Sequence, residues 1–297
     1  MLYTTFIKEY KHLYQTLMTK YNILHLKAIM MNILLYYFLK SKFNTNCFHY
    51  SDVIQFLEKL LPPDLRCYIF NVNLDDNIFN QICMCLNNYN FTLTESLKQC
   101  EEFIDPSIFS QLHEYFKEDY EKTINGAYYT QLEEQIFMCQ RALVYYLNKQ
   151  DKIEKLDNKY IFYNEFNNLT DNELIKKLSD IVILDPAVGT GNLMIIMLNV
   201  ILSLLSKFCL NNQFDYTKII HTLVYNIYGF DIDDYAIFIT KLRLFLFLLN
   251  NSCFNYQIPF NIYKINDSLL RKDKDLIQQY LRKKSRYNFN ESSLYTT

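Results

Sequence analysis

The sequence contains very few of the residues that make tight turns. Its 297 residues include only four glycines and five prolines. A sandwich or barrel of many short strands needs a turn residue at most chain reversals, so the composition argues against an all-β fold and favours long helices. A hydrophobic fraction of 50% against a charged fraction of 21% excludes a wholly disordered chain. The length allows one large domain or two modest ones.

Signatures of several other protein classes are also missing. No CxxC among the eight cysteines pairs with a second CxxC or a His pair, so we expect reduced thiols and no metal site. The N-terminus lacks the charged-then-apolar pattern of a signal peptide, and the longest apolar stretch, 193–205, is too short to span a bilayer. We therefore expect a soluble protein of the cytoplasm, or of an organelle stroma, with no membrane partner.

The first 120 residues have the pattern of consecutive helices, and we treat residues 1–120 as a helical N-terminal domain. Apolar residues recur at helical spacing, Ser51 is a candidate N-cap, and Pro62-Pro63 is a candidate helix terminator. No reactive constellation is visible in this part of the sequence. The individual helices are predicted over residues 23–39, 51–61, 94–103 and 106–120.

The pattern changes after residue 120, where three short β-like runs appear at Ile181–Asp185, Asn226–Asp231 and Phe260–Ile265. Apolar helices are expected after the first two runs, to about Ser206 and from about Asp234 to Leu249. Alternation of strands and helices is typical of an α/β fold with a parallel sheet and crossover connections.

A loop that suits ligand binding lies between the first strand and its helix, in the segment Asp185-Pro-Ala-Val-Gly-Thr-Gly-Asn192. Its two glycines permit a tight turn and a close backbone approach to a ligand. The sequence has no GKS or GKT for a P-loop, and Met194 is too large for a dinucleotide fingerprint. S-adenosylmethionine fits better, because its positive sulfonium and ammonium groups favour a carboxylate such as Asp185.

Further carboxylates follow the next two strands. Asp231 is a candidate acceptor for ribose hydroxyls, and Asp267 is a candidate acceptor for the adenine amino group or, alternatively, a helix N-cap. Upstream, Thr130 in Gly126-Ala-Tyr-Tyr-Thr130 offers a hydroxyl for the methionine carboxylate, and it can also cap a helix that starts near Gln131. Asp233 and Asp234 are expected to start the helix after the second strand.

Four segments in this order resemble the cofactor half of adenine-N6 DNA methyltransferases, above all the gamma-class enzymes of restriction–modification systems (type IIG and type I modification subunits). They are residues 126–130, 184–192, 226–233 and 239–244. The resemblance implies a Rossmann-like S-adenosylmethionine-binding part over residues 121–270 and double-stranded DNA as partner. It also implies cofactor contacts from Thr130, Asp185, Ala187, Gly189, Gly191, Asp231 and Asp267.

The sequence departs from this family at two points. Gln131 stands where the family usually has Pro, and the Asn/Asp-Pro-Pro-Tyr/Phe catalytic loop is missing, since the only Pro-Pro is Pro62-Pro63. We therefore assign no catalytic residue and expect an incomplete sheet and a truncated or split enzyme, inactive alone, that needs a second polypeptide. The alternatives are a non-catalytic S-adenosylmethionine-binding remnant and a helical interaction protein. The basic segment 271–297 is either a phosphate contact or a solvated tail.

Overall fold

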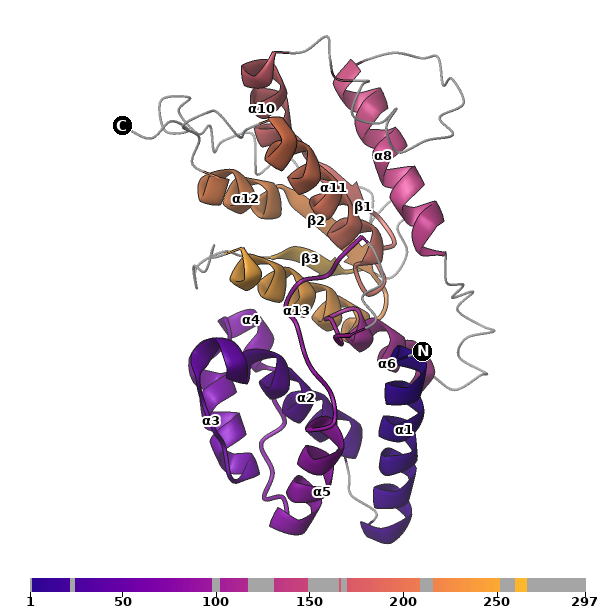
Figure 1. The fold of residues 1–297 in the computed structure, drawn as a ribbon, viewed down its shortest axis with the longest axis vertical. Helices are drawn as coiled ribbons and strands as arrows, with labels where there is room; N and C mark the ends of the chain where they lie inside the picture. The colour runs from indigo at the N-terminus through magenta and orange to yellow at the C-terminus, as the bar shows by residue number, and fades with distance from the viewer. Residues whose placement is uncertain are drawn as a thin grey trace. The chain divides into compact units, whose positions relative to one another are not determined.

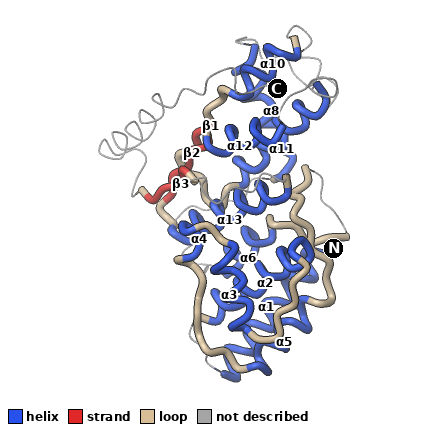
Figure 2. The backbone as a smooth tube through the Cα atoms, turned by 90° about the vertical axis from the view of Figure 1, so that its left-hand side faces the viewer, coloured by secondary structure: helices blue, strands red, loops and turns tan. Residues whose placement is uncertain are grey.

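The computed structural model of this chain describes two compact units (Figure 1). One holds the described residues up to Phe116 and the other holds those from Gln131 onward. The first unit consists of helices and loops, and the second combines helices with a small sheet (Figure 2). The described residues are 2–21, 25–97, 102–116, 131–148, 166, 170–208, 216–251 and 260–265.

The first unit is built around one apolar helix, α2. Helix α2 is buried along most of its length, from Leu26 to Leu39, as expected for a helix that is apolar on all sides. Helices α1, α3 and α5 contact it or one another. Each fully buried Leu or Phe contributes about 1.5–3 kcal/mol. The helices of this unit are α1 (Leu2–Tyr21), α2 (Leu26–Phe43), α3 (Tyr50–Leu60), α4 (Pro63–Arg66), α5 (Asp76–Leu86) and α6 (Ile108–Phe116).

Buried tyrosines join these helices through their hydroxyl groups. The Tyr10 hydroxyl donates to the Met30 carbonyl at 2.6 Å, and the Tyr50 hydroxyl donates to the Phe70 carbonyl at 2.6 Å. The Tyr37 hydroxyl donates to Asn87 Oδ1 at 2.7 Å. A buried Tyr hydroxyl without a partner would be costly, so these contacts hold α2 against α1 and the end of α5, and α3 against the segment after α4.

The helices predicted over residues 23–39, 51–61 and 106–120 correspond to α2, α3 and α6, and Pro62-Pro63 follows the end of α3. The helix predicted over 94–103 is wrong. The described residues there are not helical, and Phe91 instead forms a β-bridge with Ile104.

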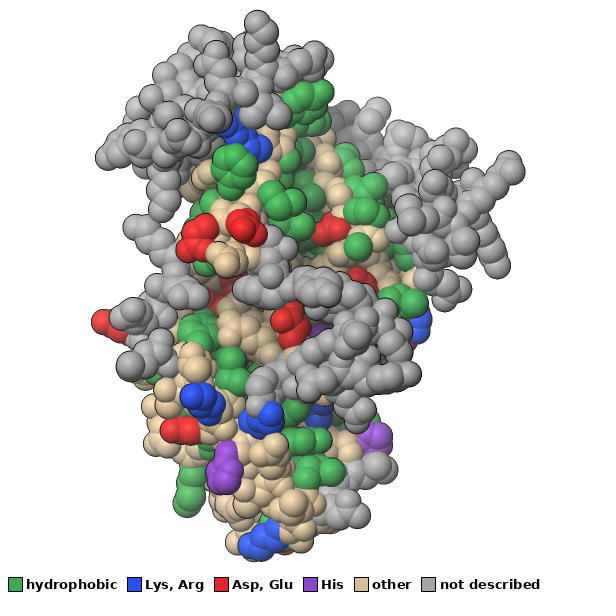
Figure 3. All heavy atoms as spheres, turned by 90° about the vertical axis from the view of Figure 1, so that its right-hand side faces the viewer, with side chains coloured by type: hydrophobic (Ala, Val, Ile, Leu, Met, Phe, Trp, Pro, Cys, Tyr) green, Lys and Arg blue, Asp and Glu red, His purple; other side chains and the backbone are tan. Residues whose placement is uncertain are grey.

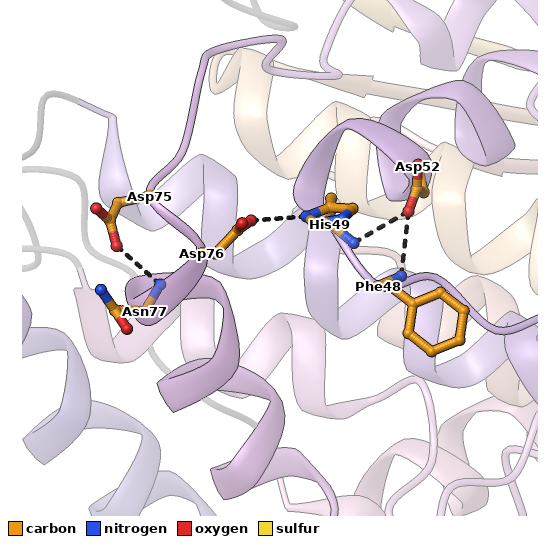
Figure 4. Close-up of polar contacts among 6 residues, drawn as sticks. All are labelled: Phe48, His49, Asp52, Asp75, Asp76 and Asn77. Atoms are coloured by element: carbon orange, nitrogen blue, oxygen red, sulfur yellow. Dashed lines mark hydrogen bonds and ion pairs between the residues drawn. The ribbon is translucent and has the colours of Figure 1, made fainter.

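The predicted N-cap of α3 is also wrong, because α3 begins at Tyr50 with His49 as its N-cap. Asp52 Oδ2 accepts the backbone N–H of His49 at 3.0 Å and that of Phe48 at 3.1 Å (Figure 4). The carboxylate in the first turn thus accepts the N–H of the N-cap residue and that of the residue before it, which is the backward half of a capping box.

The second unit contains a three-stranded parallel sheet in the order β1-β2-β3, which confirms the predicted strands and their direction. Ile183 lies opposite Ile227, and Gly229 lies opposite Ile262. The elements are α8 (Leu132–Asn148), α10 (Asp171–Ser179), β1 (Ile183–Asp185), α11 (Asn192–Phe208), α12 (Tyr216–Tyr225), β2 (Ile227–Asp231), α13 (Asp234–Asn250) and β3 (Asn261–Lys264).

Two crossover helices carry most of the packing around this sheet. Helix α13 packs against β2 and β3, and α11 lies between α8 and α13 (Figure 1). Parallel strands need such coverage because both faces of the sheet are apolar. The sequence had not predicted α10 and α12, which precede β1 and β2. Thr170 and Glu173 form a capping box at the start of α10, the pattern that identifies a helix start.

Within the described residues no helix is long and apolar enough to cross a membrane. The same residues contain no group of three or more His, Cys, Asp or Glu side chains placed to hold a metal ion.

Candidate cofactor site

The loop from β1 to α11 turns through two glycines in the left-handed region. Gly189 has a φ of +53° and Gly191 has a φ of +84°. The Gly191 N–H donates to the Val188 carbonyl at 2.9 Å, which closes the turn, and the Ile195 N–H then donates to Gly191 to begin α11. A side chain other than glycine is strained at such angles, so the sequence folds into this loop because of these two residues.

The tip of β2 holds this loop through Asp231. Asp231 Oδ2 accepts the Gly189 N–H at 2.7 Å, and its Oδ1 accepts the Asp233 N–H at 2.9 Å. The Val188 N–H donates to the Phe230 carbonyl at 2.9 Å. A carboxylate offers about four lone-pair sites, so Asp231 retains acceptor capacity for a ligand hydroxyl while it holds the loop.

At the tip of β1 lies the second carboxylate, Asp185. Its Oδ1 accepts the Ala187 N–H at 3.0 Å. Burial raises the pKa of Asp185 above its ordinary value, and repulsion from Asp231 raises it further, against the opposing effect of the Ala187 hydrogen bond. A negative charge here is therefore unfavourable in the free protein, and a cationic ligand would relieve it.

The two loop glycines have different steric surroundings. A Cβ atom added at Gly191 would lie 2.9 Å from Thr240 Cγ2, which is too close, whereas a Cβ atom at Gly189 would meet no heavy atom of the described residues within 4 Å. In β2, a Cβ atom at Gly229 would lie 2.9 Å from both Ile262 Cδ1 and Met194 Cε. Packing against the short, buried Thr240 side chain therefore restricts Gly191, whereas the side-chain ends near Gly229 can shift. The described residues leave the space beside Gly189 open.

Helix α13 contributes two residues that the sequence reasoning had not identified. The Thr240 hydroxyl donates to the Gly189 carbonyl at 2.8 Å, and Arg243 Nη1 donates to the Thr190 carbonyl at 2.7 Å. Both side chains are buried, with exposed fractions of 0% and 2%. Their signal in the sequence is a pair of polar residues three apart in a largely apolar helix, which places both on one face.

The structure brings five of the seven predicted site residues together at the ends of β1 and β2: Asp185, Ala187, Gly189, Gly191 and Asp231. Asp233 is the N-cap of α13, as predicted, and accepts the N–H groups of Tyr235 and Ala236 at 2.9 and 3.1 Å. Thr130 and Asp267 lie outside the described residues, as do Gly126 and the basic segment 271–297.

Residues 159–278 match the family model described as "MmeI, DNA-methyltransferase domain". This range contains the whole β1–α11–β2–α13–β3 succession and the glycine loop.

Two known proteins are similar to longer parts of the chain. One is described as "Putative type II restriction enzyme and methyltransferase RM.MjaORFECS2P" of Methanocaldococcus jannaschii, 29% identical over 204 residues, which are 60% of this chain and 17% of that protein. The other is the solved structure of the type IIL restriction-modification enzyme MmeI in complex with DNA, with 16% identity, a TM-score of 0.49, and coverage of 92% of this chain and 41% of that one.

The family model and the curated relative support a restriction–modification methyltransferase. The chain spans less than a fifth of the length of that curated relative.

The surface of the described residues carries little concentrated positive charge on the face shown in Figure 3, where Lys and Arg side chains lie scattered among carboxylates and apolar groups. A protein that binds the phosphate backbone of DNA usually gathers such side chains on one surface. The visible face therefore offers no continuous basic surface within the described part of the chain.

Proposed function

We propose that this chain carries the S-adenosylmethionine-binding part of a DNA adenine-N6 methyltransferase of the restriction–modification type. One observation carries the proposal: a glycine loop lies between the carboxylates Asp185 and Asp231, and the described part of the chain leaves open space beside Gly189. Ligands of open parallel sheets bind at the carboxyl ends of the strands, which is where these three residues lie.

The residues present fit this cofactor in charge and in shape. Asp185 has a raised pKa because it is buried near another carboxylate, and the sulfonium and ammonium groups of the cofactor would offset that repulsion. Asp231 supplies acceptors for the ribose hydroxyls, and Ala187, Gly189 and Gly191 supply backbone close to the ligand. Thr130 and Asp267 are proposed to complete the site.

When bound, S-adenosylmethionine supplies an electrophilic methyl group, and the residues of this chain bind and orient the cofactor. The sequence contains no Asn/Asp-Pro-Pro-Tyr/Phe motif. We therefore propose that the residues that accept the hydrogens of the adenine amino group and stack on the flipped base come from outside residues 1–297. Residues 1–297 by themselves would then bind the cofactor without transferring its methyl group.

The similarity of residues 159–278 to a DNA-methyltransferase domain supports double-stranded DNA as the substrate. The curated relative, described as both a restriction enzyme and a methyltransferase, supports a role in restriction–modification. Recognition of the target sequence is proposed to belong to parts of such a system beyond these residues.

Calorimetry with S-adenosylmethionine and the full chain tests the cofactor site. We expect saturable binding that Asp231→Asn weakens, since hydrogen bonds to a charged group contribute about 1.5–3 kcal/mol each. Asp234→Asn is the matched control, because Asp234 is an exposed carboxylate three residues away that pairs with Lys264. Equal affinity of the wild type and Asp231→Asn would contradict the ribose assignment.

Transfer of radiolabelled methyl groups to duplex DNA tests the second part of the proposal. The purified chain alone is expected to transfer none, and addition of a polypeptide that carries the Asn/Asp-Pro-Pro-Tyr/Phe loop and a recognition domain is expected to restore N6-methyladenine. Methylation of adenine N6 by the purified chain alone would show that the catalytic loop is not required from elsewhere.

A further inference from the structure

Two carbonyl groups of the glycine loop are bound to helix α13 by side chains from within its buried face. The Thr240 hydroxyl contacts the carbonyl of Gly189 at 2.8 Å and the carbonyl of Ala236, one helical turn back, at 3.1 Å. A helical Thr commonly bonds to the carbonyl four residues earlier. Here the hydroxyl has two carbonyl acceptors within reach, and the shorter contact is with the loop carbonyl of Gly189.

Arg243 holds the next carbonyl of the loop. Its Nη1 donates to the Thr190 carbonyl at 2.7 Å and to Asn192 Oδ1 at 2.6 Å, so it spans the last loop residues and the first residue of α11. A cation that is 98% buried costs free energy unless hydrogen bonds compensate for lost water. A Leu at this position of an apolar helix would pack at lower cost, which indicates that the guanidinium is needed for its contacts.

The hydrogen bonds from Thr240 and Arg243 fix the direction in which two loop carbonyls point, and this also fixes the direction of the N–H groups that follow them. In a planar trans peptide the N–H lies opposite to the preceding carbonyl. Because the Gly189 carbonyl faces Thr240, the N–H of Thr190 is turned away from α13. If this peptide flipped, as the permissive backbone of Gly189 allows, a carbonyl oxygen would replace that donor and would repel an anionic group of the ligand.

We propose that Thr240 and Arg243 are positioning residues for the cofactor, which hold the loop carbonyls on α13 so that the Thr190 N–H remains available to the carboxylate end of S-adenosylmethionine. This inference rests on the proposed function for the identity of the ligand, and on the loop contacts for the mechanism. Neither residue touches the cofactor itself.

The chain offers a matched pair of threonines for the test. Thr240→Val replaces the hydroxyl with a methyl group of similar size, and Thr240→Ser retains the hydroxyl. Thr222→Val is the control, because the Thr222 hydroxyl also donates to the carbonyl four residues earlier, that of Lys218 at 3.0 Å, but lies in α12. All variants are first compared by thermal unfolding, so that loss of fold is separated from loss of positioning.

Two measurements are made on each variant of the full chain. Calorimetry gives the Kd for S-adenosylmethionine, which we expect Thr240→Val to raise roughly fivefold to tenfold, the effect of one net hydrogen bond, with recovery in Thr240→Ser. Hydrogen–deuterium exchange of the peptide covering 185–192, without cofactor, is expected to accelerate in Thr240→Val. Thr222→Val is expected to match the wild type in both measurements.

Arg243→Lys and Arg243→Met extend the test to the second anchor. Lys keeps a charged donor and is expected to retain part of the affinity, whereas Met is expected to raise the Kd by more than Thr240→Val does. If Arg243→Met does not fold, the Thr240 variants still decide the question.

The two proposals fail in different ways. If the wild type binds S-adenosylmethionine and Thr240→Val binds equally well with unchanged exchange in 185–192, the positioning role is overturned. If the wild type binds no cofactor but Thr240→Val still accelerates exchange only in this loop, Thr240 does position the loop and the proposed ligand is wrong.

Discussion

The two units of this molecule make left-handed turns with different residues, although they share one biased composition. In the helical unit, His25 and Asn44 have φ values of 63° and 48° at the two ends of α2, and residues 1–125 contain no glycine. In the α/β unit, the left-handed positions are Gly189 and Gly191. A left-handed residue at a helix end tolerates Asn, so the turn alone does not require glycine.

The use of glycine in the α/β unit is explained by the atoms that lie close to its backbone. Gly191 and Gly229 have side chains of other elements where a Cβ atom would be, and at Gly189 the residues that the structure describes leave that space open. In a chain so poor in glycine, the residue therefore marks close approach to the backbone, by protein atoms at two positions and, in our account, by the cofactor at Gly189. The two units also differ in their polar contacts. Tyrosine hydroxyls join helices in the helical unit, whereas side chains of α13 hold the glycine loop in the α/β unit.

The largest effect is expected from Gly191→Ala, which adds left-handed strain to a collision with Thr240. We expect the free energy of unfolding of the α/β unit to fall by about 2–5 kcal/mol, the sum of backbone strain and overpacking. Denaturant unfolding followed by a probe in each unit measures this. A loss no greater than that of Gly189→Ala, which meets no neighbour, would show that packing does not require Gly191.

Gly189→Asn separates stability from ligand binding. Asn tolerates the left-handed region, and Asn44 has a similar φ, so the unfolding free energy is expected to change by less than about 1 kcal/mol. Its side chain would occupy the open space beside Gly189, and the Kd for S-adenosylmethionine is expected to rise by at least about tenfold, roughly 1.4 kcal/mol.

The reverse substitution in the helical unit, Asn44→Gly, is expected to leave both the unfolding free energy and the Kd for S-adenosylmethionine nearly unchanged. Calorimetry and thermal unfolding of the two variants make the comparison. Unchanged cofactor affinity in Gly189→Asn would mean that the ligand does not approach there.

Asp185→Asn is expected to stabilise the free protein while it weakens cofactor binding. The pKa of Asp185 is raised, so its charge disfavours the folded state above that pKa, and the penalty disappears as the pH falls and the carboxyl is protonated. Asn retains an acceptor for the Ala187 N–H. We therefore expect a Tm a few degrees above the wild type at pH 7 and a difference that vanishes near pH 3.8, the ordinary pKa of Asp.

Melting curves from pH 3.5 to 8 measure this difference, and Asp180→Asn, an exposed carboxylate at the end of α10, is the control. A Tm for Asp185→Asn below that of the wild type at pH 7 would contradict the unfavourable charge.

The smallest effect concerns the helical unit, where His49 Nδ1 lies 2.8 Å from Asp76 Oδ1 and joins α3 to α5 (Figure 4). The hydrogen bond and charge of Asp76 raise the pKa of His49 above 6.5. The pair therefore stabilises the fold fully below pH 6.5 and ceases to do so as the pH rises through the raised pKa. His49→Gln is expected to lower the Tm slightly at pH 6 and not at pH 9.

The control for this pair is His12→Gln, a change at an exposed histidine of α1. Equal Tm differences for His49→Gln at pH 6 and pH 9 would refute the pH dependence, and calorimetry at both pH values should show no change in the Kd for S-adenosylmethionine.

The sheet was predictable from sequence because β-like runs, intervening apolar helices and a glycine loop coincide there. The helix predicted over 94–103 was wrong because apolar spacing alone does not reveal the pairing of Phe91 with Ile104, which depends on tertiary contact. The cap of α3 was missed because Asp52 bonds backward to His49, so the helix begins two residues earlier than a Ser51 cap implies.

For the site, strand-end carboxylates and glycines could be identified from type and spacing, but their partners could not. Asp231 was assigned to the ribose, and nothing in the sequence indicated that it also accepts the Gly189 N–H. Thr240 and Arg243 lie about fifty residues after the loop they hold. Contacts of such sequence separation emerge only when α13 packs on β2.

The central claim, that a cofactor approaches the backbone of the glycine loop in the α/β unit, has a direct test in the four glycines of the chain. A nitrogen–proton correlation spectrum of the full chain labelled with ¹⁵N-glycine contains four signals, which Gly→Ala variants assign. Our account predicts that added S-adenosylmethionine shifts the signals of Gly189 and Gly191 saturably. A folded chain in which none of the four signals moves at millimolar cofactor would contradict it.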